Sequence, residues 1–223
     1  MIATITQQDA ATELVANYLS TLKNQGFSGD TDASYATRLT ASTDNSIYQQ
    51  IPQGVIFPKT EKDIQLALQT ASRDPFLSLT FGPRGGGTGT NGQSLTPGIV
   101  VDLSRYMREI LEINVEEGWV RVQTGVIKDQ LNDFLKPYGF FFSPDLSTSN
   151  RATIGGMIST DASGQGSLVY GKTSDHVLGL TTYLVDGSPM VTSPIDIEKA
   201  KVIAEQESLI GSLYKTVLEI SLN

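Results

Sequence analysis

The chain has 223 residues, of which 39% are hydrophobic and 18% charged, and its formal net charge is −8. Such a chain can bury a sizeable core as one large domain or two small ones. The negative charge argues against nucleic-acid binding, which needs clustered lysine and arginine. No apolar run is long enough to cross a bilayer, and no secretory signal is recognisable. We expect a cytoplasmic protein, with peripheral membrane attachment left open.

Cysteine is absent from the chain, and histidine occurs once, at His176. This composition excludes disulfides, thiolate metal sites, iron–sulfur ligation and histidine-rich metal sites within the chain. We expect His176, which directly precedes a strand-like run, to be a structural residue. The sequence therefore predicts neither a metal ligand nor a catalytic residue in this chain.

The first hundred residues predict a helical segment followed by a small βαβ layer. Residues 8–24 have the apolar spacing of an amphipathic helix, and residues 28–46 are polar and irregular. The helix of the βαβ layer begins with a capping box, in which Thr60 accepts from early backbone N–H groups. Strands are expected at residues 55–57, 77–81 and 99–103, with the helix at 60–71.

Beyond residue 104 the pattern changes to hairpins and helices. Residues 110–114 and 119–123 predict an antiparallel hairpin, and residues 126–135 predict a helix that ends before Pro137. The three phenylalanines at 140–142 indicate a buried strand or core plug. The remaining expected elements are a strand at 177–185, a turn at 186–187 leading into 190–191, and two helices within 196–222 interrupted near Gly211.

The fold class predicted from these elements is α+β, with a boundary near residue 104 and no internal repeat. Residues 1–50 are expected as an N-terminal helical segment and residues 51–104 as a first subdomain with the small βαβ layer. Residues 105–223 are expected as a second subdomain with a larger, mainly antiparallel sheet and helices, truncated at its C-terminal end.

Residues 83–92 contain five glycines among ten residues and follow an apolar run. A backbone so free of Cβ atoms can adopt positive φ and turn successive N–H groups inward, which suits a phosphate or pyrophosphate. Thr88 and Thr90 add hydroxyl donors, and Arg84 adds a positive charge. A flexible linker is the alternative interpretation, but linkers are rarely held between two apolar strand-like runs.

Two known phosphate motifs do not fit this glycine loop. Residues 87–92 match G-x-G-x-x-G, but the dinucleotide-binding version needs a helix to begin there, and here a strand follows. A P-loop needs G-K-[ST], and no lysine occurs between Lys62 and Lys128. We therefore expect the loop to bind phosphate by another plan.

A second small-residue stretch, residues 153–166, is rich in Gly, Ala, Ser and Thr. Such residues let the backbone approach a large flat ligand. A plain surface loop is the alternative, but two such loops following apolar segments fit one extended ligand better.

The ordered motifs resemble the FAD-binding (PCMH-type) domain of the vanillyl-alcohol oxidase / p-cresol methylhydroxylase superfamily. Within it the chain is most similar to bacterial FAD-linked D-2-hydroxyacid dehydrogenases, the D-lactate and D-2-hydroxyglutarate dehydrogenases. Residues 43–48 and 147–153 resemble the large members with iron–sulfur motifs. The other motifs that carry the resemblance lie at residues 83–89, 99–104, 122–126, 153–157 and 170–175.

The resemblance implies a non-covalently bound FAD. In that family the first loop holds the pyrophosphate, and the second region lines the flavin and its ribityl chain. Relatives that attach FAD covalently have histidine at the position of Thr88. Relatives often have Asn-Ala-Gly-Gly at 161–164. The cofactor-binding residues implied are Pro83, Arg84, Gly85, Gly86, Gly87, Thr88, Gly89, Thr90, Asn91, Pro144, Thr153, Gly155, Gly156, Asp161, Ala162, Ser163 and Gly164.

The resemblance also implies a function. Such proteins oxidise a D-2-hydroxy acid to the 2-oxo acid by hydride transfer to FAD and pass the electrons onward. The chain lacks the family's Gly-Ser/Thr-Glu-Gly-Thr segment and its substrate domain, so we expect an inactive fragment or an engineered chain. The iron–sulfur cluster, the base and the small-molecule substrate site would lie outside it. A sugar or alcohol oxidase of the same superfamily, or a flavin- or nucleotide-binding module without redox chemistry, are the alternatives.

Overall fold

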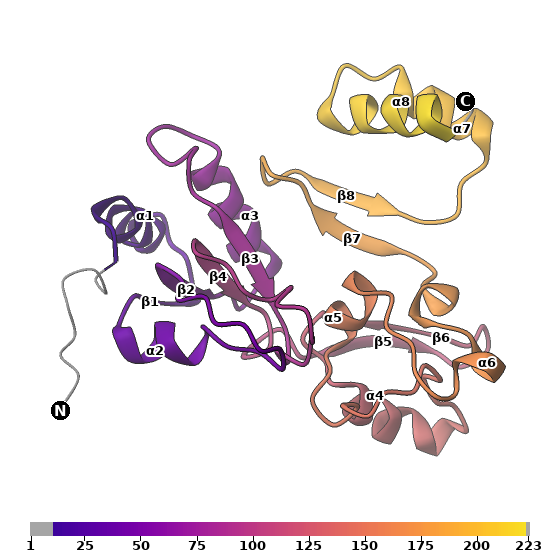
Figure 1. Cartoon of the computed structure of the whole chain (residues 1–223). Coiled ribbons are helices and arrows are strands. Elements are labelled where there is room, and N and C mark those ends of the chain that lie inside the picture. Colours follow the sequence, from indigo (N-terminus) through magenta and orange to yellow (C-terminus); the bar gives the residue numbers. More distant parts are fainter. Residues whose placement is uncertain (1–10, 222–223) are drawn as a thin grey trace, which may run out of the picture.

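The computed structural model describes residues 11–221, and Figure 1 shows how the elements are arranged. No helix in this range is long and apolar enough to cross a membrane. The N-terminal part contains one sheet with helices packed on it. Its elements are α1 (Glu13–Asn24), β1 (Asp30–Asp32), α2 (Tyr35–Thr40), β2 (Gly54–Phe57), α3 (Glu61–Ala71), β3 (Phe81–Arg84) and β4 (Ile99–Asp102).

The sheet has the strand order β1-β2-β4-β3. Strands β2, β4 and β3 run parallel, and β1 joins β2 antiparallel. Helix α3 lies between β2 and β3 in the chain, which makes the predicted βαβ unit. The carboxyl ends of β3 and β4 are level, because Arg84 pairs with Asp102. The glycine loop therefore leaves the sheet at the edge where open α/β sheets bind ligands.

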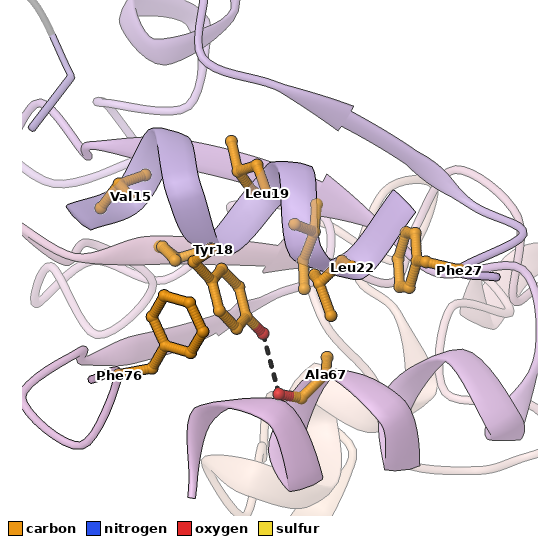
Figure 2. Packing of buried hydrophobic residues seen from close by; sticks show 9 residues of the cluster. Val15, Tyr18, Leu19, Leu22, Phe27, Ala67 and Phe76 are labelled. Carbon is orange, nitrogen blue, oxygen red and sulfur yellow. Dashed lines mark hydrogen bonds between the residues drawn. The ribbon is translucent and has the colours of Figure 1, made fainter. Parts of the chain in front are cut away.

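A continuous hydrophobic cluster joins α1, the sheet and α3 (Figure 2). Tyr18 lies at its centre, with its ring edge-on to Phe76 at 5.4 Å and to Phe81 at 5.7 Å. Its hydroxyl donates to the Ala67 carbonyl at 2.8 Å, so the buried oxygen keeps a partner. Burial raises the pKa of Tyr18 well above its usual value.

Asp63 fastens the start of α3 to the chain before β1. Its carboxylate accepts from the Ser28 N–H at 2.7 Å, the Ser28 hydroxyl at 2.8 Å and the Lys59 N–H at 2.9 Å. With Thr60 it forms the capping box that the sequence predicts. Burial opposes ionisation, but the donors from Ser28, Lys59 and Thr60 hold the pKa of Asp63 below its usual range.

The C-terminal part contains a β-hairpin covered by helices, a second β-hairpin and a final pair of helices. Strands β5 and β6 pair as the predicted antiparallel hairpin, and α4 and α5 share a hydrophobic cluster with them. The elements are β5 (Ile110–Asn114), β6 (Trp119–Val122), α4 (Lys128–Leu135), α5 (Ile154–Ser159), α6 (Ser167–Tyr170), β7 (Leu180–Tyr183), β8 (Pro189–Thr192), α7 (Ile197–Ala204) and α8 (Leu209–Ser221), with 3-10 turns at Lys136–Tyr138 and Thr173–His176.

The predicted larger antiparallel sheet is not present as one sheet. Strands β5–β6 and β7–β8 form two separate two-stranded ladders among the described residues. The α+β class and the antiparallel pairing are confirmed. The domain boundaries stay predictions, although β1 and α1 pack with the sheet of residues 54–102 rather than apart from it.

Several predicted elements need correction in the N-terminal part. Residues 28–46 are irregular only in part, because β1 pairs through backbone groups with Val55 to Phe57 and Ser34 caps α2. The strand expected at 77–81 begins only at Phe81, since the Leu79 N–H bonds the Phe76 carbonyl in a turn. Residues 8–10 of the first helix lie outside the described residues.

The phenylalanine run at 140–142 is neither a strand nor buried. Phe140 and Phe141 are 41% and 57% exposed. Only Phe142 packs on the core, because Asn132 accepts its N–H at 2.7 Å and fixes its direction. Among the later elements, β7 is shorter than the strand expected at 177–185.

The two C-terminal helices are interrupted before Gly211, not at it. The break lies at 205–208, and Gly211 is inside α8, where a Cβ would meet the Gln206 carbonyl at 2.1 Å. Glycine is thus needed there for close packing, which sequence alone cannot distinguish from a helix break. Residue 222 of this prediction lies outside the described residues.

Candidate cofactor-binding site

A cleft of about 510 Å³ opens between the two small-residue loops at the carboxyl edge of the sheet. It brings together most of the residues implied for FAD. Those in its wall are Pro83, Arg84, Gly85, Gly86, Gly87, Thr88, Gly89, Thr90, Thr153, Gly155, Gly156, Ala162 and Ser163.

The backbone N–H groups of residues 86–90 donate no hydrogen bond within the described part of the chain. Gly87 has φ +62°, a left-handed conformation that favours glycine. All five residues line the cleft, so these unpaired N–H groups belong to its wall. A run of unpaired amide donors on irregular backbone suits an anion.

Two glycines of the loop serve packing between loops. A Cβ on Gly85 would lie 2.1 Å from Thr153 Oγ1, and one on Gly86 would lie 2.1 Å from the Arg151 carbonyl oxygen. These contacts seal the glycine loop against residues 151–153. Because Gly85 and Gly86 have no Cβ atoms, the glycine loop can pack directly on residues 151–153. The same feature lets a ligand approach the backbone of the loop closely.

Arg84 is engaged with protein oxygens. Its Nη2 donates to the Thr43 carbonyl at 2.6 Å, and its Nη1 to the Ala41 carbonyl and the Ser94 hydroxyl at 3.4 Å each. Its guanidinium also lies beside Gly87. Arg84 therefore positions the loop, and its charge contributes to the field of the cleft.

The second loop is built on α5, whose N-cap Thr153 accepts from the Gly156 N–H at 3.3 Å. The Gly155 N–H donates to the Thr124 carbonyl at 2.8 Å, and a Cβ on Gly155 would meet the Thr124 Cβ at 2.6 Å. Thr124 follows β6 and lines the cleft. The end of the hairpin thus forms part of the wall.

Asp161 has φ +45°, a conformation that Asp and Asn tolerate better than most residues. Its carboxylate pairs with the Lys172 ammonium and accepts from the Ser174 N–H at 2.9 Å. The Lys172 hydrogen bond, followed by that from Ser174, lowers the pKa of Asp161 to about 2. These contacts hold the 161–163 turn, so that Ala162 and Ser163 line the cleft while Asp161 does not.

Three other implied residues also lie outside the cleft wall. The Asn91 N–H donates to the Gln93 side chain at 2.9 Å, and Pro144 is buried. Gly164 packs on the Asp145 carbonyl, where no Cβ could fit. These three residues contact other protein groups outside the cleft and support the loops that form its wall.

The cleft also contains residues absent from the sequence-based set. Thr124 and Thr148 lie within motifs that carried the resemblance, and Ser159 and Thr160 within the second small-residue stretch, so a signal existed for them. Leu103 directly follows β4. The full set of additions is Gln93, Ser94, Leu103, Thr124, Leu146, Thr148, Ala152, Met157, Ser159 and Thr160.

His176 lies outside the cleft wall. Its Nε2 is 2.7 Å from the Tyr170 carbonyl oxygen and 3.0 Å from the Ser143 hydroxyl. The ring therefore ties the 143 segment to α6. These contacts support the structural role expected for His176.

The cleft contains hydroxyls, amide groups and apolar surface, and Arg84 is its only ionisable side chain among the described lining residues. No group of three metal-ligating side chains occurs in residues 11–221. The arrangement can therefore bind a long, partly anionic ligand. It offers no carboxylate or imidazole that could take a proton from a substrate.

Comparisons with known proteins agree with this geometry. A family model described as an FAD binding domain matches residues 52–193. D-2-hydroxyglutarate dehydrogenase of Escherichia coli is 58% identical over 98% of this chain and 22% of that protein. The enzyme of the same name from Pseudomonas putida is 55% identical over 92% and 21%. The chain spans about a fifth of the length of these relatives.

Solved structures share the fold at low sequence identity. An alkyldihydroxyacetonephosphate synthase superposes with a TM-score of 0.68 at 17% identity, over 89% of this chain and 38% of that one. The 6-hydroxy-D-nicotine oxidase of Arthrobacter nicotinovorans gives a TM-score of 0.65 at 22% identity, over 75% and 36%. These similarities show that the chain shares its fold with these proteins.

Proposed function

The chain belongs to the FAD binding domain family, and from this premise we propose that it is the FAD-binding portion of a D-2-hydroxyacid dehydrogenase. The whole enzyme would oxidise a D-2-hydroxy acid to the 2-oxo acid, with D-2-hydroxyglutarate as the substrate to test first. The sequence identity of 58% to an enzyme of that name supports this choice. The cytoplasm is the compartment that we propose.

One observation carries the cofactor assignment. The five consecutive N–H groups of residues 86–90 have no partner within residues 11–221, and these residues line a cleft whose opposite wall is the α5 loop. The donor set is uncharged apart from Arg84. Such a set suits the pyrophosphate of a dinucleotide, while the backbone of residues 153–163 suits a flat ring system.

The chain's own residues bind and orient the cofactor. The amides of residues 86–90 and the hydroxyls of Thr88 and Thr90 would hold the pyrophosphate. Thr124, Thr153 and the α5 loop would hold the remaining polar groups. When bound, FAD supplies the acceptor for the hydride that leaves the substrate Cα. The hydroxyl proton needs a base from outside this cleft, because no lining side chain can accept it.

We propose non-covalent attachment, because the loop position that carries histidine in covalent relatives is Thr88. The electron acceptor, including an iron–sulfur region, would lie outside this chain, which contains no cysteine. We expect the chain alone to bind FAD weakly and not to turn over.

FAD retention tests this proposal. The chain is equilibrated with FAD across an ultrafiltration membrane, and flavin absorbance is measured on both sides. We expect an excess of flavin on the protein side and its release by acid precipitation. Flavin that remains with the precipitate would contradict non-covalent attachment, and failure to bind at high FAD concentration would contradict the cofactor assignment.

A further inference from the structure

Two apolar side chains stand exposed on residues 43–48, which we name the rim loop. Ile47 is 94% exposed and Tyr48 is 58% exposed. Neither belongs to a hydrophobic cluster of the described residues. Single exposed apolar residues are common on protein surfaces, so the exposure alone decides nothing. The hydrogen bonds that hold the rim loop beside the cleft make this exposure relevant to ligand binding.

The rim loop is fixed by two hydrogen bonds to the glycine loop and one to Ser94 just after it, between segments about forty to fifty residues apart. This anchoring places the rim loop rigidly beside the cleft. The bonds run from Arg84 Nη2 to the Thr43 carbonyl (2.6 Å), from the Asn45 N–H to the Gly87 carbonyl (3.1 Å) and from the Ser94 hydroxyl to the Asp44 carboxylate (3.2 Å).

The Tyr48 ring lies against the far end of the glycine loop. A Cβ on Gly92 would come within 3.2 Å of Tyr48 Cδ2, and Gly92 has φ +74°. Thr90 and Gln93, on either side of this position, both line the cleft. The Tyr48 N–H donates to Ser46 Oγ at 3.1 Å, which fixes the backbone that carries the ring. Tyr48 itself does not line the cleft; its ring lies against Gly92, between the lining residues Thr90 and Gln93.

We propose that Tyr48 is a cofactor-binding residue, whose ring lies just beyond the cleft wall and packs against one planar ring system of FAD. This inference rests on the proposed function. FAD has two such rings, isoalloxazine and adenine, and both are flat aromatic heterocycles that pack favourably on an aromatic side chain. Arg84 and Ser94 act through the rim loop, by holding Tyr48 in place.

Variants at Tyr48 test the proposal through binding alone. FAD affinity is measured by ultrafiltration for the wild type, Tyr48→Ala and Tyr48→Phe. Tyr138→Ala serves as the matched control, because Tyr138 is 45% exposed and packs beside Phe134 of α4, a helix from which no residue lines the cleft. We expect Tyr48→Ala to weaken FAD binding at least about fivefold, the loss typical of removing a stacked ring. Tyr48→Phe and Tyr138→Ala should bind like the wild type.

Displacement of FAD by FMN and by ADP identifies the ring. If Tyr48→Ala weakens FMN binding, Tyr48 packs on isoalloxazine; if it weakens ADP binding, Tyr48 packs on adenine. Unchanged affinity of Tyr48→Ala for all three ligands overturns the proposal while leaving FAD binding intact. A wild-type chain that binds no FAD overturns the proposed function and this inference with it. Circular dichroism of each variant confirms that it is folded.

Discussion

The N-terminal sheet and the C-terminal segment from Leu178 onward bury their apolar residues very differently. The first has a continuous cluster in which α1, α3 and the strands share fully buried side chains. In the second, Ala200 is the only buried hydrophobic residue among those described. Exposed there are Leu178, Val185, Val191, Ile195, Ile197, Val202, Leu209, Leu213, Val217 and Ile220.

The two regions are therefore held by different forces. Hydrophobic burial supports the sheet, while β7–β8 and α7–α8 rely on contacts within each pair. The β7–β8 hairpin touches the sheet region through the Tyr183 hydroxyl, which donates to Glu61 Oε2 at 2.9 Å, and through Gly187 against Gln69. Burial, and then Glu61, raises the pKa of Tyr183 to about 12. We therefore expect the C-terminal segment to unfold locally at a lower free energy than the sheet.

The largest expected effect is at Tyr18, the centre of the N-terminal cluster. Tyr18→Ala should lower the free energy of unfolding by about 3–5 kcal/mol, because it leaves a cavity beside Phe76 and Phe81. Tyr18→Phe removes only the bond to the Ala67 carbonyl and should cost about 1 kcal/mol. Chemical denaturation measures both. Equal losses in the two variants would show that ring packing is not what supports this region.

Asp63 should show a smaller, pH-dependent effect. Asp63→Ala removes the acceptor of several hydrogen bonds and should cost about 2–3 kcal/mol at pH 7. The folded-state pKa of Asp63 is lowered, so this stability is present above about pH 5 and is lost as pH falls through the folded pKa. Denaturation at pH 7 and pH 3 should therefore show a shrinking difference from the wild type.

Asp133→Ala is the control for this prediction, since Asp133 is exposed on α4. It should change stability little at either pH. A loss for Asp63→Ala that stays constant between pH 7 and pH 3 would contradict the role given to the ionised carboxylate.

Substitution of Gly86 tests the packing of the glycine loop against residues 151–153. Gly86→Ala should cost about 1–3 kcal/mol, because its Cβ meets the Arg151 carbonyl, a backbone atom that cannot rotate away. Gly156→Ala, whose closest contact is Thr153 Oγ1 at 3.2 Å, should cost less. Both are measured by thermal denaturation without ligand. An unchanged denaturation midpoint for Gly86→Ala would mean that the glycine loop does not pack on Arg151 in solution.

The smallest effect is expected on α8. Val217→Ala should change stability by no more than about 0.5 kcal/mol, because Val217 is exposed. The same substitution at the buried Val15 of α1 should cost about 2 kcal/mol. Losses of similar size at the two valines would show that the C-terminal segment has a buried face in solution.

Local signals in the sequence were enough to predict the capping box, the β5–β6 hairpin and both small-residue loops, because each depends on residues close together in the chain. They could not predict the engagement of Arg84, whose partners Ala41 and Thr43 lie some forty residues away. They also could not predict that Gly86 packs against the Arg151 carbonyl, where a Cβ would not fit.

The prediction of a buried strand or core plug at residues 140–142 was wrong for a related reason. Three aromatic residues in a row favour burial, but a single hydrogen bond from the Phe142 N–H to Asn132 decides which of them faces the core. Asp161 is a similar case, since its contacts with Lys172 and Ser174 turn its carboxylate away from the cleft. Such contacts depend on tertiary structure rather than on local pattern.

The most direct test of the central claim is the amide spectrum of the chain during titration with FAD. Nuclear magnetic resonance reports each backbone N–H separately, so it can locate the ligand on the chain. We predict that the largest shifts occur at residues 86–90 and 153–163, with little change in α8. Largest shifts in α7–α8 or the β5–β6 turn, or no shifts at all, would contradict the claim that this cleft holds FAD.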